Sequence, residues 1–199
     1  ITSGEVEYTL ISLNPAEYPE LPSLTEEVPF RISSGILKDM IKRTVFAVSA
    51  DDGKTVHRGV KFEVRAGEIK LVALDGYRLA IRNEFIEYNG NDLSFVVPAK
   101  TLYEIIKLAE NDENIIEIVK GRRHIMFNVG GYRLISKLLE GEFLDYRTAF
   151  PKGKSATVRI STKRLMDCIE RTSIIITEKV RGPIRCIFED EELKLSAVT

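Results

Sequence analysis

The sequence predicts an α+β fold in which antiparallel sheets pack against two helices per domain. Short segments of alternating apolar residues recur along the chain and are separated by turns such as Ala66-Gly67 and Asp75-Gly76. Longer segments instead place apolar residues at helical spacing. The chain also repeats itself, which is typical of stacked supersecondary units rather than of a lone globule.

Between residues 28 and 138 one order of elements occurs twice: a strand, a helix and three more strands. Ser33 or Ser34 is a suitable N-cap for a first helix that runs to about residue 44. Pro98 opens a second helix at about 100–110, because proline suits the first helical turn. The predicted strands lie at 28–33, 59–65, 68–74, 77–86, 93–97, 115–119, 124–129 and 132–138.

The flanks of this region contain breaks in the pattern. Residues 1–13 alternate as a strand, and Pro15, Pro19 and Pro22 then predict a linker. A second linker is expected just after residue 151. Beyond it the sequence predicts a strand at 157–161, a helix at 162–172 and strands near 184–189 and 193–198.

The segment after the second linker repeats the start of the first half. The triplet Arg-Ile-Ser at 31–33 recurs at 159–161, and at the same offset Leu37 matches Leu165. The first residues of the chain resemble the end of the complete repeat. We therefore interpret the chain as the tail of one repeat, one complete repeat and the head of a third.

Composition excludes some classes of protein. The net charge of −1 over 199 residues gives no global basic signature of a nucleic-acid binder, although a local basic face is compatible with it. No apolar run approaches the length of a membrane span. The N-terminus lacks a signal-peptide pattern and a starting Met, so we expect a fragment or a processed chain.

Residues with catalytic or ligating chemistry are sparse and scattered. His57 and His124 are the only histidines, and no nucleotide-binding or nucleophile motif occurs. Cys168 and Cys186 form no metal-binding pattern and are expected to be reduced thiols at core positions, since they match Met40 and Phe62 in the repeat. The sequence therefore predicts no catalytic residues, no metal site and no cofactor.

Four segments, in this order, resemble the bacterial replicative sliding clamp, the beta subunit of DNA polymerase III. They are LVALDGYRLA at 71–80, VPAKTLYEII at 97–106, SKLLEGEFLDYRTAFP at 136–151 and EKVRGPIR at 178–185. The resemblance covers the whole chain and implies the DNA-clamp fold, with the sheets outside. It divides the chain into the last strands of a first domain (1–20), a complete second domain (28–151) and the first half of a third (156–199).

The resemblance also implies a function. Family members form a head-to-tail dimeric ring around duplex DNA, bind it without sequence preference and perform no chemistry. They tether the polymerase and clamp-loader subunits through short peptide motifs, and so give processivity. On this basis we expect a cytoplasmic, nucleoid-associated bacterial protein with no membrane partner and no enzymatic activity.

Each predicted helix leaves basic side chains on its polar face, and the family turns these helices toward DNA. Mobile cations suit diffuse phosphate contact by a ring that slides. Helix surfaces are usually charged, however, and acidic neighbours such as Asp39 and Glu104 dilute these faces. The DNA-facing residues that the resemblance implies are Lys38, Lys42, Arg43, Lys54, His57, Arg58, Lys100, Lys107, Lys163, Arg164 and Arg171.

In the family, partner proteins insert an extended peptide into an apolar pocket between the second and third domains. Such a pocket needs an apolar floor and a few orienting polar groups. From the residues alone, Leu74 and Leu79 could equally be strand core and Gly76 a turn residue. The pocket residues that the resemblance implies are Leu74, Gly76, Tyr77, Arg78, Leu79, Leu144, Thr148 and Ala149.

Two other classes of function stay open at this point. An enzyme with an unrecognised site would show a tight cluster of perturbed ionisable groups in a cleft. A repeat protein that binds only proteins would lack net positive charge on its helix faces. Either observation would count against a DNA clamp.

Overall fold

The structure is a computed structural model that describes residues 1–17, 22, 24, 28–50, 53, 55–150, 153, 157–176, 182–189 and 191–197. The chain separates into two compact units, Ile1–Ala149 and Phe150–Thr199. The first unit holds both predicted halves, and the second holds the partial repeat that follows them.

The N-terminal segment is a small hairpin. Strand β1 (Thr2–Ser3) pairs antiparallel with β2 (Val6–Glu7), and a 3-10 turn, Pro15–Glu17, follows. The prediction of one strand over 1–13 is therefore wrong, because the chain reverses direction at Gly4 between β1 and β2.

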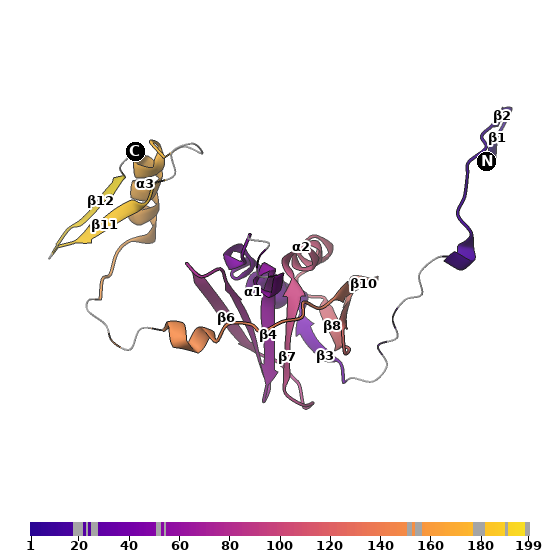
Figure 1. The fold of residues 1–199 in the computed structure, drawn as a ribbon, viewed down its shortest axis with the longest axis horizontal. Coiled ribbons are helices and arrows are strands. Elements are labelled where there is room, and N and C mark those ends of the chain that lie inside the picture. The colour runs from indigo at the N-terminus through magenta and orange to yellow at the C-terminus, as the bar shows by residue number, and fades with distance from the viewer. Residues whose placement is uncertain are drawn as a thin grey trace. The chain divides into compact units, whose positions relative to one another are not determined.

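Two four-stranded antiparallel sheets form the body of the first unit. Their strands are β3 (Phe30–Ser33), β4 (Gly59–Arg65), β5 (Glu68–Leu74), β6 (Leu79–Phe85), β7 (Leu93–Pro98), β8 (Ile115–Lys120), β9 (His124–Val129) and β10 (Tyr132–Lys137). One sheet has the order β6-β5-β4-β7 and the other β10-β9-β8-β3 (Figure 1). All eight strands predicted in this region are present, and their ends differ from the prediction by at most two residues.

The two halves exchange their first strands. β3 precedes the first helix but pairs antiparallel with β8 of the second half, and β7 pairs in the same way with β4 of the first half. Phe62 and Phe95 lie opposite each other in β4 and β7, with stacked rings 5.3 Å apart. Neither half can complete its sheet alone, so the two halves form one folding unit.

Helices α1 (Ser34–Lys42) and α2 (Ala99–Leu108) lie next to each other on the same side of the sheets (Figure 1). Their apolar faces and the inward faces of both sheets share a single core. Leu37, Leu102 and Ile105 are fully buried in it. Burial of large aliphatic side chains of this kind stabilises by roughly 1.5–3 kcal/mol each.

The first turn of α1 packs on the loop that follows α2. Ser33 occupies the N-cap position, as predicted, but its hydroxyl donates to the carbonyl of Asp112 at 2.9 Å instead of capping the helix. The backbone N–H groups of Ser34 and Gly35 donate to carbonyls of the same loop. A Cβ at Gly35 would lie 2.8 Å from the Cβ of Asp112, so this close approach requires glycine.

The second unit contains α3 (Thr162–Ser173), β11 (Ile184–Phe188) and β12 (Leu193–Ala197), as predicted. The strand predicted at 157–161 is absent: its equivalent β3 is a strand paired with β8, and the described residues of the second unit contain no such partner strand for 157–161. Here Ser161 does cap its helix, accepting from the backbone N–H of Arg164.

The core positions of the repeat are uncovered in this second unit. Ile32 and Ile41 are 4% and 0% exposed, whereas the matching Ile160 and Ile169 are 43% and 39% exposed. The prediction that Cys168 and Cys186 are core residues is corrected for the same reason: Cys168 is half-buried and Cys186 is exposed. Met40 and Phe62 are buried in the core that both halves share, and the described residues of the second unit form no such second layer over Cys168 and Cys186.

Candidate functional site

A second, smaller apolar cluster lies on the outer face of the sheet β6-β5-β4-β7. Successive strand residues point to opposite faces, so Ala73 enters the main core while Val72 and Leu74 face away from the helices. We call the group on this face the outer cluster. It consists of Val72, Leu74 and Tyr146, with Leu79, Ile81 and Phe143 packed against them.

The chain after β10 crosses this outer face. We call residues 139–149 the covering segment; it runs across β7 and β4 toward β6 and ends in the 3-10 turn Tyr146–Ala149 (Figure 1). It starts with the backbone N–H of Leu139 donating to the carbonyl of Val96 in β7 at 2.9 Å. Phe143 and Tyr146 then point into the outer cluster.

Tyr146 also makes a polar contact with β4. Its hydroxyl donates to Oε2 of Glu63 at 2.8 Å, and Lys61 pairs with Oε1 of the same carboxylate at 2.8 Å. Burial raises the pKa of Tyr146 to about 12, and the hydrogen bond to Glu63 acts in the same direction. Burial also raises the pKa of Glu63, but the hydrogen bonds from Lys61 and Tyr146 outweigh it, so this pKa lies below its ordinary value.

His57 holds the next part of the covering segment. Its ring meets the ring of Phe143 edge to face at 5.2 Å, and its Nε2 accepts from the backbone N–H of Leu144 at 3.4 Å. His57, Gly141 and Leu144 line a cavity of about 660 Å³. His57 is buried, so it has little surface for the DNA contact that the sequence suggested, and the structure places it with the covering segment instead.

The turn between β5 and β6 is organised by Asp75. Its Oδ1 accepts from the backbone N–H groups of Tyr77 and Arg78 at 3.0 and 3.1 Å, and its Oδ2 accepts from Nε of Arg78 at 2.9 Å. Burial raises the pKa of Asp75, but these hydrogen bonds outweigh it and place the pKa below its ordinary value. Gly76 has φ +92°, which favours glycine, and the Tyr77 side chain is 99% exposed.

The structure brings some of the predicted pocket residues together. Leu74 and Leu79 share the outer cluster, and the turn with Gly76, Tyr77 and Arg78 joins their two strands. The other three lie on the covering segment: Leu144 is half-exposed beside His57, and Thr148 and Ala149 are exposed in the 3-10 turn.

Sequence reasoning missed the residues that hold the covering segment. Strand alternation could have found Val72 and Ile81, which lie two positions from Leu74 and Leu79 on the same face. No local signal could have identified the contact between Glu63 and Tyr146, because the two residues are 83 positions apart in the sequence.

The basic residues of α1 and α2 differ in whether they pair with other groups of the protein. Lys42 and Lys100 are exposed and form no ion pair with the described part of the chain. Lys38 donates to the carbonyl of Ala109 at 2.9 Å and to Asp112 at 3.1 Å, so it joins α1 to the end of α2. Arg43 pairs with Asp39 and Lys107 with Glu104, both at the surface.

The remaining predicted DNA-facing residues are surface residues or are not described. Arg58 is exposed in the 3-10 turn Thr55–Arg58. Lys163, Arg164 and Arg171 are exposed on α3 in the second unit. Lys54 lies outside the described residues, as do the first four residues of the motif at 178–185.

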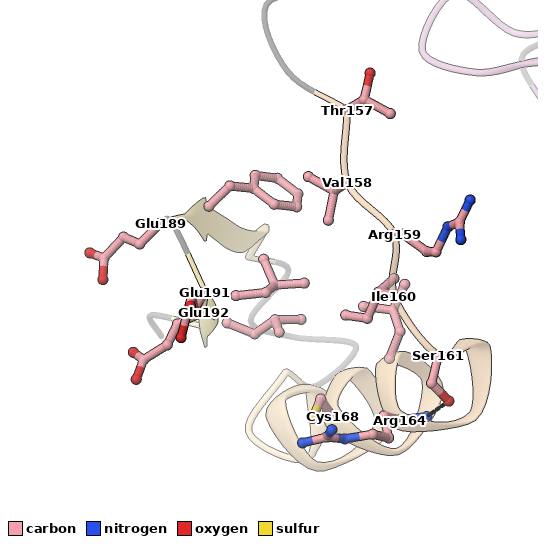
Figure 2. Close-up of a pocket in the computed structure, with 14 residues that line it drawn as sticks. Thr157, Val158, Arg159, Ile160, Ser161, Arg164, Cys168, Glu189, Glu191 and Glu192 are labelled. Atoms are coloured by element: carbon pink, nitrogen blue, oxygen red, sulfur yellow. Dashed lines mark hydrogen bonds between the residues drawn. The ribbon is translucent and has the colours of Figure 1, made fainter.

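The second unit has a pocket of about 630 Å³ between the segment 157–161, α3 and the ends of β11 and β12. Val158 and Ile160 point into it and Arg159 points away (Figure 2). Both apolar residues occupy repeat positions that are buried core in the first unit, so the pocket is uncovered core surface.

The described ranges contain neither a metal-ligand cluster nor a membrane-spanning helix. Within them, no three His, Cys, Asp or Glu side chains gather as a possible metal-ligand set. No helix formed by those residues is long and apolar enough to cross a membrane.

The fold is thus an α+β repeat protein with paired antiparallel sheets and two helices on one side of them. The sequence model of the family "DNA polymerase III beta subunit, central domain" matches residues 31–145, from β3 into the covering segment. Because this match covers more than half of the chain, the chain belongs to the DNA polymerase III beta subunit family.

Curated relatives carry the name beta sliding clamp. The protein of Halalkalibacterium halodurans is 35% identical over 181 residues, which are 89% of this chain and 48% of that protein. The protein of Staphylococcus aureus is 31% identical over 199 residues, which are 100% of this chain and 53% of that protein. The chain therefore spans about half the length of the curated relatives it matches.

Solved structures of sliding clamps have the same fold. The Pseudomonas aeruginosa sliding clamp bound to griselimycin has a TM-score of 0.86 at 30% identity, covering 96% of this chain and 52% of that chain. The Bacillus subtilis DNA polymerase sliding clamp has a TM-score of 0.84 at 26% identity, covering 99% of this chain and 55% of that chain.

Proposed function

We propose that this chain functions within a sliding clamp that encircles duplex DNA and tethers the replicative polymerase without performing chemistry. The observation that carries the proposal is the match of residues 31–145 to the central domain of the DNA polymerase III beta subunit. The unit with two sheets and two helices occupies this same stretch. The relatives named beta sliding clamp support the same assignment.

The helices supply the proposed contact with DNA. With its C-cap residue Arg43, α1 carries three cations and one carboxylate, and α2 carries two lysines and one glutamate. The exposed Lys42 and Lys100 are the best-placed phosphate contacts, because other basic residues of these helices are engaged with the protein. A modest positive excess on mobile side chains suits weak, sequence-independent binding that permits sliding.

The outer cluster supplies the proposed pocket for partner peptides. Leu74 and Leu79 give an apolar floor, and the turn 75–78 gives polar groups at its edge. Leu144, Thr148 and Ala149 are exposed on the covering segment and would supply the other wall. Polymerase and clamp-loader subunits would insert a short extended segment with aliphatic or aromatic anchors.

The perturbed ionisable groups do not favour the enzyme alternative. Glu63 and Tyr146 form the clearest such group, but the pKa of Glu63 is lowered and that of Tyr146 is raised to about 12. A general acid or base works best with a pKa near the working pH, and both shifts lead away from it. The alternative that binds only proteins is less favoured because both helices keep a positive excess.

We further propose the division of the chain into residues 1–20, 28–151 and 156–199 as parts of three clamp domains. In that arrangement the ring is a head-to-tail dimer, and the protein works in the bacterial cytoplasm at the nucleoid.

Topological retention on DNA tests the function. The ring-forming protein is incubated with its clamp loader and nicked circular plasmid, isolated on the plasmid by gel filtration, and the plasmid is then linearised. A sliding clamp stays on the circle and leaves the linear molecule. Equal retention on both forms would show ordinary DNA binding, and no retention on either would favour the alternative that binds only proteins.

A further inference from the structure

The covering segment has side chains that attach it to the sheet and others that stay exposed. Phe143 and Tyr146 point into the outer cluster and attach the segment to the sheet. Leu144 and Thr148 lie between and after them and are exposed, which leaves them accessible to a ligand. The positions of Leu144 and Thr148 therefore depend on how firmly Phe143 and Tyr146 are bound to the sheet.

Tyr146 is the most strongly attached of these residues. Its side chain is 6% exposed, and it belongs to the same cluster as Leu74 of the proposed pocket floor. Its hydroxyl reaches past the apolar contacts to Oε2 of Glu63 on β4. A partly buried hydrogen bond to a carboxylate is stronger than one between neutral groups, so it fixes the orientation of the ring in addition to the apolar contacts.

Lys61 holds the acceptor in place. It pairs with Oε1 of Glu63, which leaves Oε2 to accept from Tyr146. The same ammonium group lies 5.5 Å from the ring centroid of Phe143 and 5.9 Å from that of Tyr146. One cation thus contacts both attached rings and the Glu63 carboxylate.

We propose that Tyr146 is a positioning residue for the partner-peptide pocket, acting through its hydrogen bond to Glu63. The bond holds the covering segment on the sheet and so places Leu144 and Thr148 on the side of the pocket opposite Leu74 and Leu79. If the covering segment is already docked before the peptide binds, binding does not have to offset the entropy cost of ordering that segment. The inference rests on the proposed function, because it assigns a role in a pocket that is itself proposed.

The test compares the unmodified chain with Tyr146→Phe. This change keeps the ring in the outer cluster and removes only the hydroxyl. Isotope-labelled protein is titrated by NMR with an extended peptide carrying Leu and Phe anchors, which measures weak binding directly. Hydrogen exchange of the Leu144 amide, which is bonded to His57, reports the docking of the segment in the same samples.

We expect Tyr146→Phe to weaken peptide binding about three- to tenfold, in line with the loss of one partly buried hydrogen bond to a carboxylate. Exchange of the Leu144 amide should rise by a similar factor. Glu63→Gln keeps an acceptor oxygen for the hydroxyl and should preserve most of the affinity, whereas Glu63→Ala should match Tyr146→Phe. Combining Glu63→Ala with Tyr146→Phe should add little, because both remove the same bond.

Tyr88→Phe is the matched control for lost stability. Tyr88 is also buried, and its hydroxyl donates to the carbonyl of Asn91 at 2.9 Å, but it lies in the main core beside Phe30. Its removal should lower stability comparably and leave peptide affinity unchanged.

The outcomes separate the two levels of the proposal. If the unmodified chain binds no peptide, the pocket is overturned, and the role of Tyr146 in it is overturned with it. If the chain binds the peptide and Tyr146→Phe leaves the affinity unchanged, only the positioning role fails. Weakening by Tyr88→Phe as well would assign the effect to general destabilisation and would likewise overturn it.

Discussion

Arg31 in β3 lies directly opposite Glu117 in β8, and its guanidinium donates to the glutamate Oε2 at 2.8 Å. The pair joins β3, the first strand of the first half, to β8 in the sheet of the second half. It lies at the surface, with the side chains 69% and 31% exposed, so its strength is that of a surface ion pair. Because the two residues belong to different halves, the ion pair can be used to test the pairing of β3 with β8.

Charge reversal tests this exchange. Glu117→Lys places two cations opposite each other and should lower the free energy of unfolding by about 0.5–1 kcal/mol. Adding Arg31→Glu restores opposite charges and should recover most of the loss. Chemical denaturation of the single and double variants measures both steps. Additive losses in the double variant would contradict the pairing of β3 with β8.

Leu37 and Leu165 are equivalent positions of the repeat in different surroundings. Leu37 is fully buried, whereas Leu165 is half-buried in the uncovered second unit. Leu37→Ala should cost about 2–5 kcal/mol, and Leu165→Ala should cost less than half of that. Hydrogen exchange of amides in α1 and α3 measures each helix separately. Equal losses would show that something covers the second unit in solution.

The alkaline titration of Tyr146 should be visible in stability. Its pKa is raised to about 12 in the folded protein, above the ordinary value of 10.0, so the neutral phenol favours folding. This contribution is complete below pH 10.0 and is lost as the pH rises toward 12. The difference in unfolding free energy between the unmodified chain and Tyr146→Phe should therefore shrink over this range. Ultraviolet absorbance of phenolate should show one late-titrating tyrosine that the variant lacks.

Asp75→Ala should destabilise the turn between β5 and β6. The change removes the acceptor for two backbone N–H groups and the ionic partner of Arg78. We expect a loss of about 1–2 kcal/mol, measured by denaturant unfolding. The pKa of Asp75 is lowered in the folded state, so its contribution exists above the ordinary pKa and disappears as the pH falls. The stability gap between the two proteins should accordingly close in acid.

Lys42→Gln should weaken DNA binding by the ring, whereas Lys70→Gln should not. Lys42 is exposed on α1, and Lys70 lies on β5 between Ile69 and Leu71 of the main core, so it points to the face away from the helices. Loss of one phosphate contact should reduce the slope of log affinity against log salt by about 1. Fluorescence anisotropy with duplex DNA at several salt concentrations measures the slope. An unchanged slope for Lys42→Gln, or an equal fall for Lys70→Gln, would exclude the helix faces as the DNA contact.

Local chemistry was enough to predict most elements. Period-2 segments such as 59–65 and 68–74 became β4 and β5 with the predicted limits, because turns bound them on both sides. The 3-10 turn Thr55–Arg58 precedes β4, and Gly-containing turns at 66–67 and 75–76 flank β5. The repeat also predicted the partial third copy, with α3, β11 and β12. Where a local pattern needed a distant partner the prediction failed, as for the strand at 157–161, whose equivalent β3 is a strand only because β8 lies beside it.

The candidate site was predictable only in part. The motifs at 71–80 and 136–151 contain the pocket residues, because each motif is a continuous stretch of chain. The side chains that hold them in place come from elsewhere: Glu63, Lys61 and His57 contact the covering segment over more than 80 positions. The sequence places His57 with the DNA-facing residues, because a histidine in a predicted loop gives no local sign that it is buried.

By itself the sequence determined the fold class, the repeat and the family, since turn residues, periodicity and motifs depend only on residues that are close together in the chain. The tertiary structure alone decided that each half lends its first strand to the sheet of the other, and that residues 139–149 lie on the outer face. Both depend on contacts between distant residues, and such contacts form where buried area and satisfied hydrogen bonds offset the loss of chain entropy.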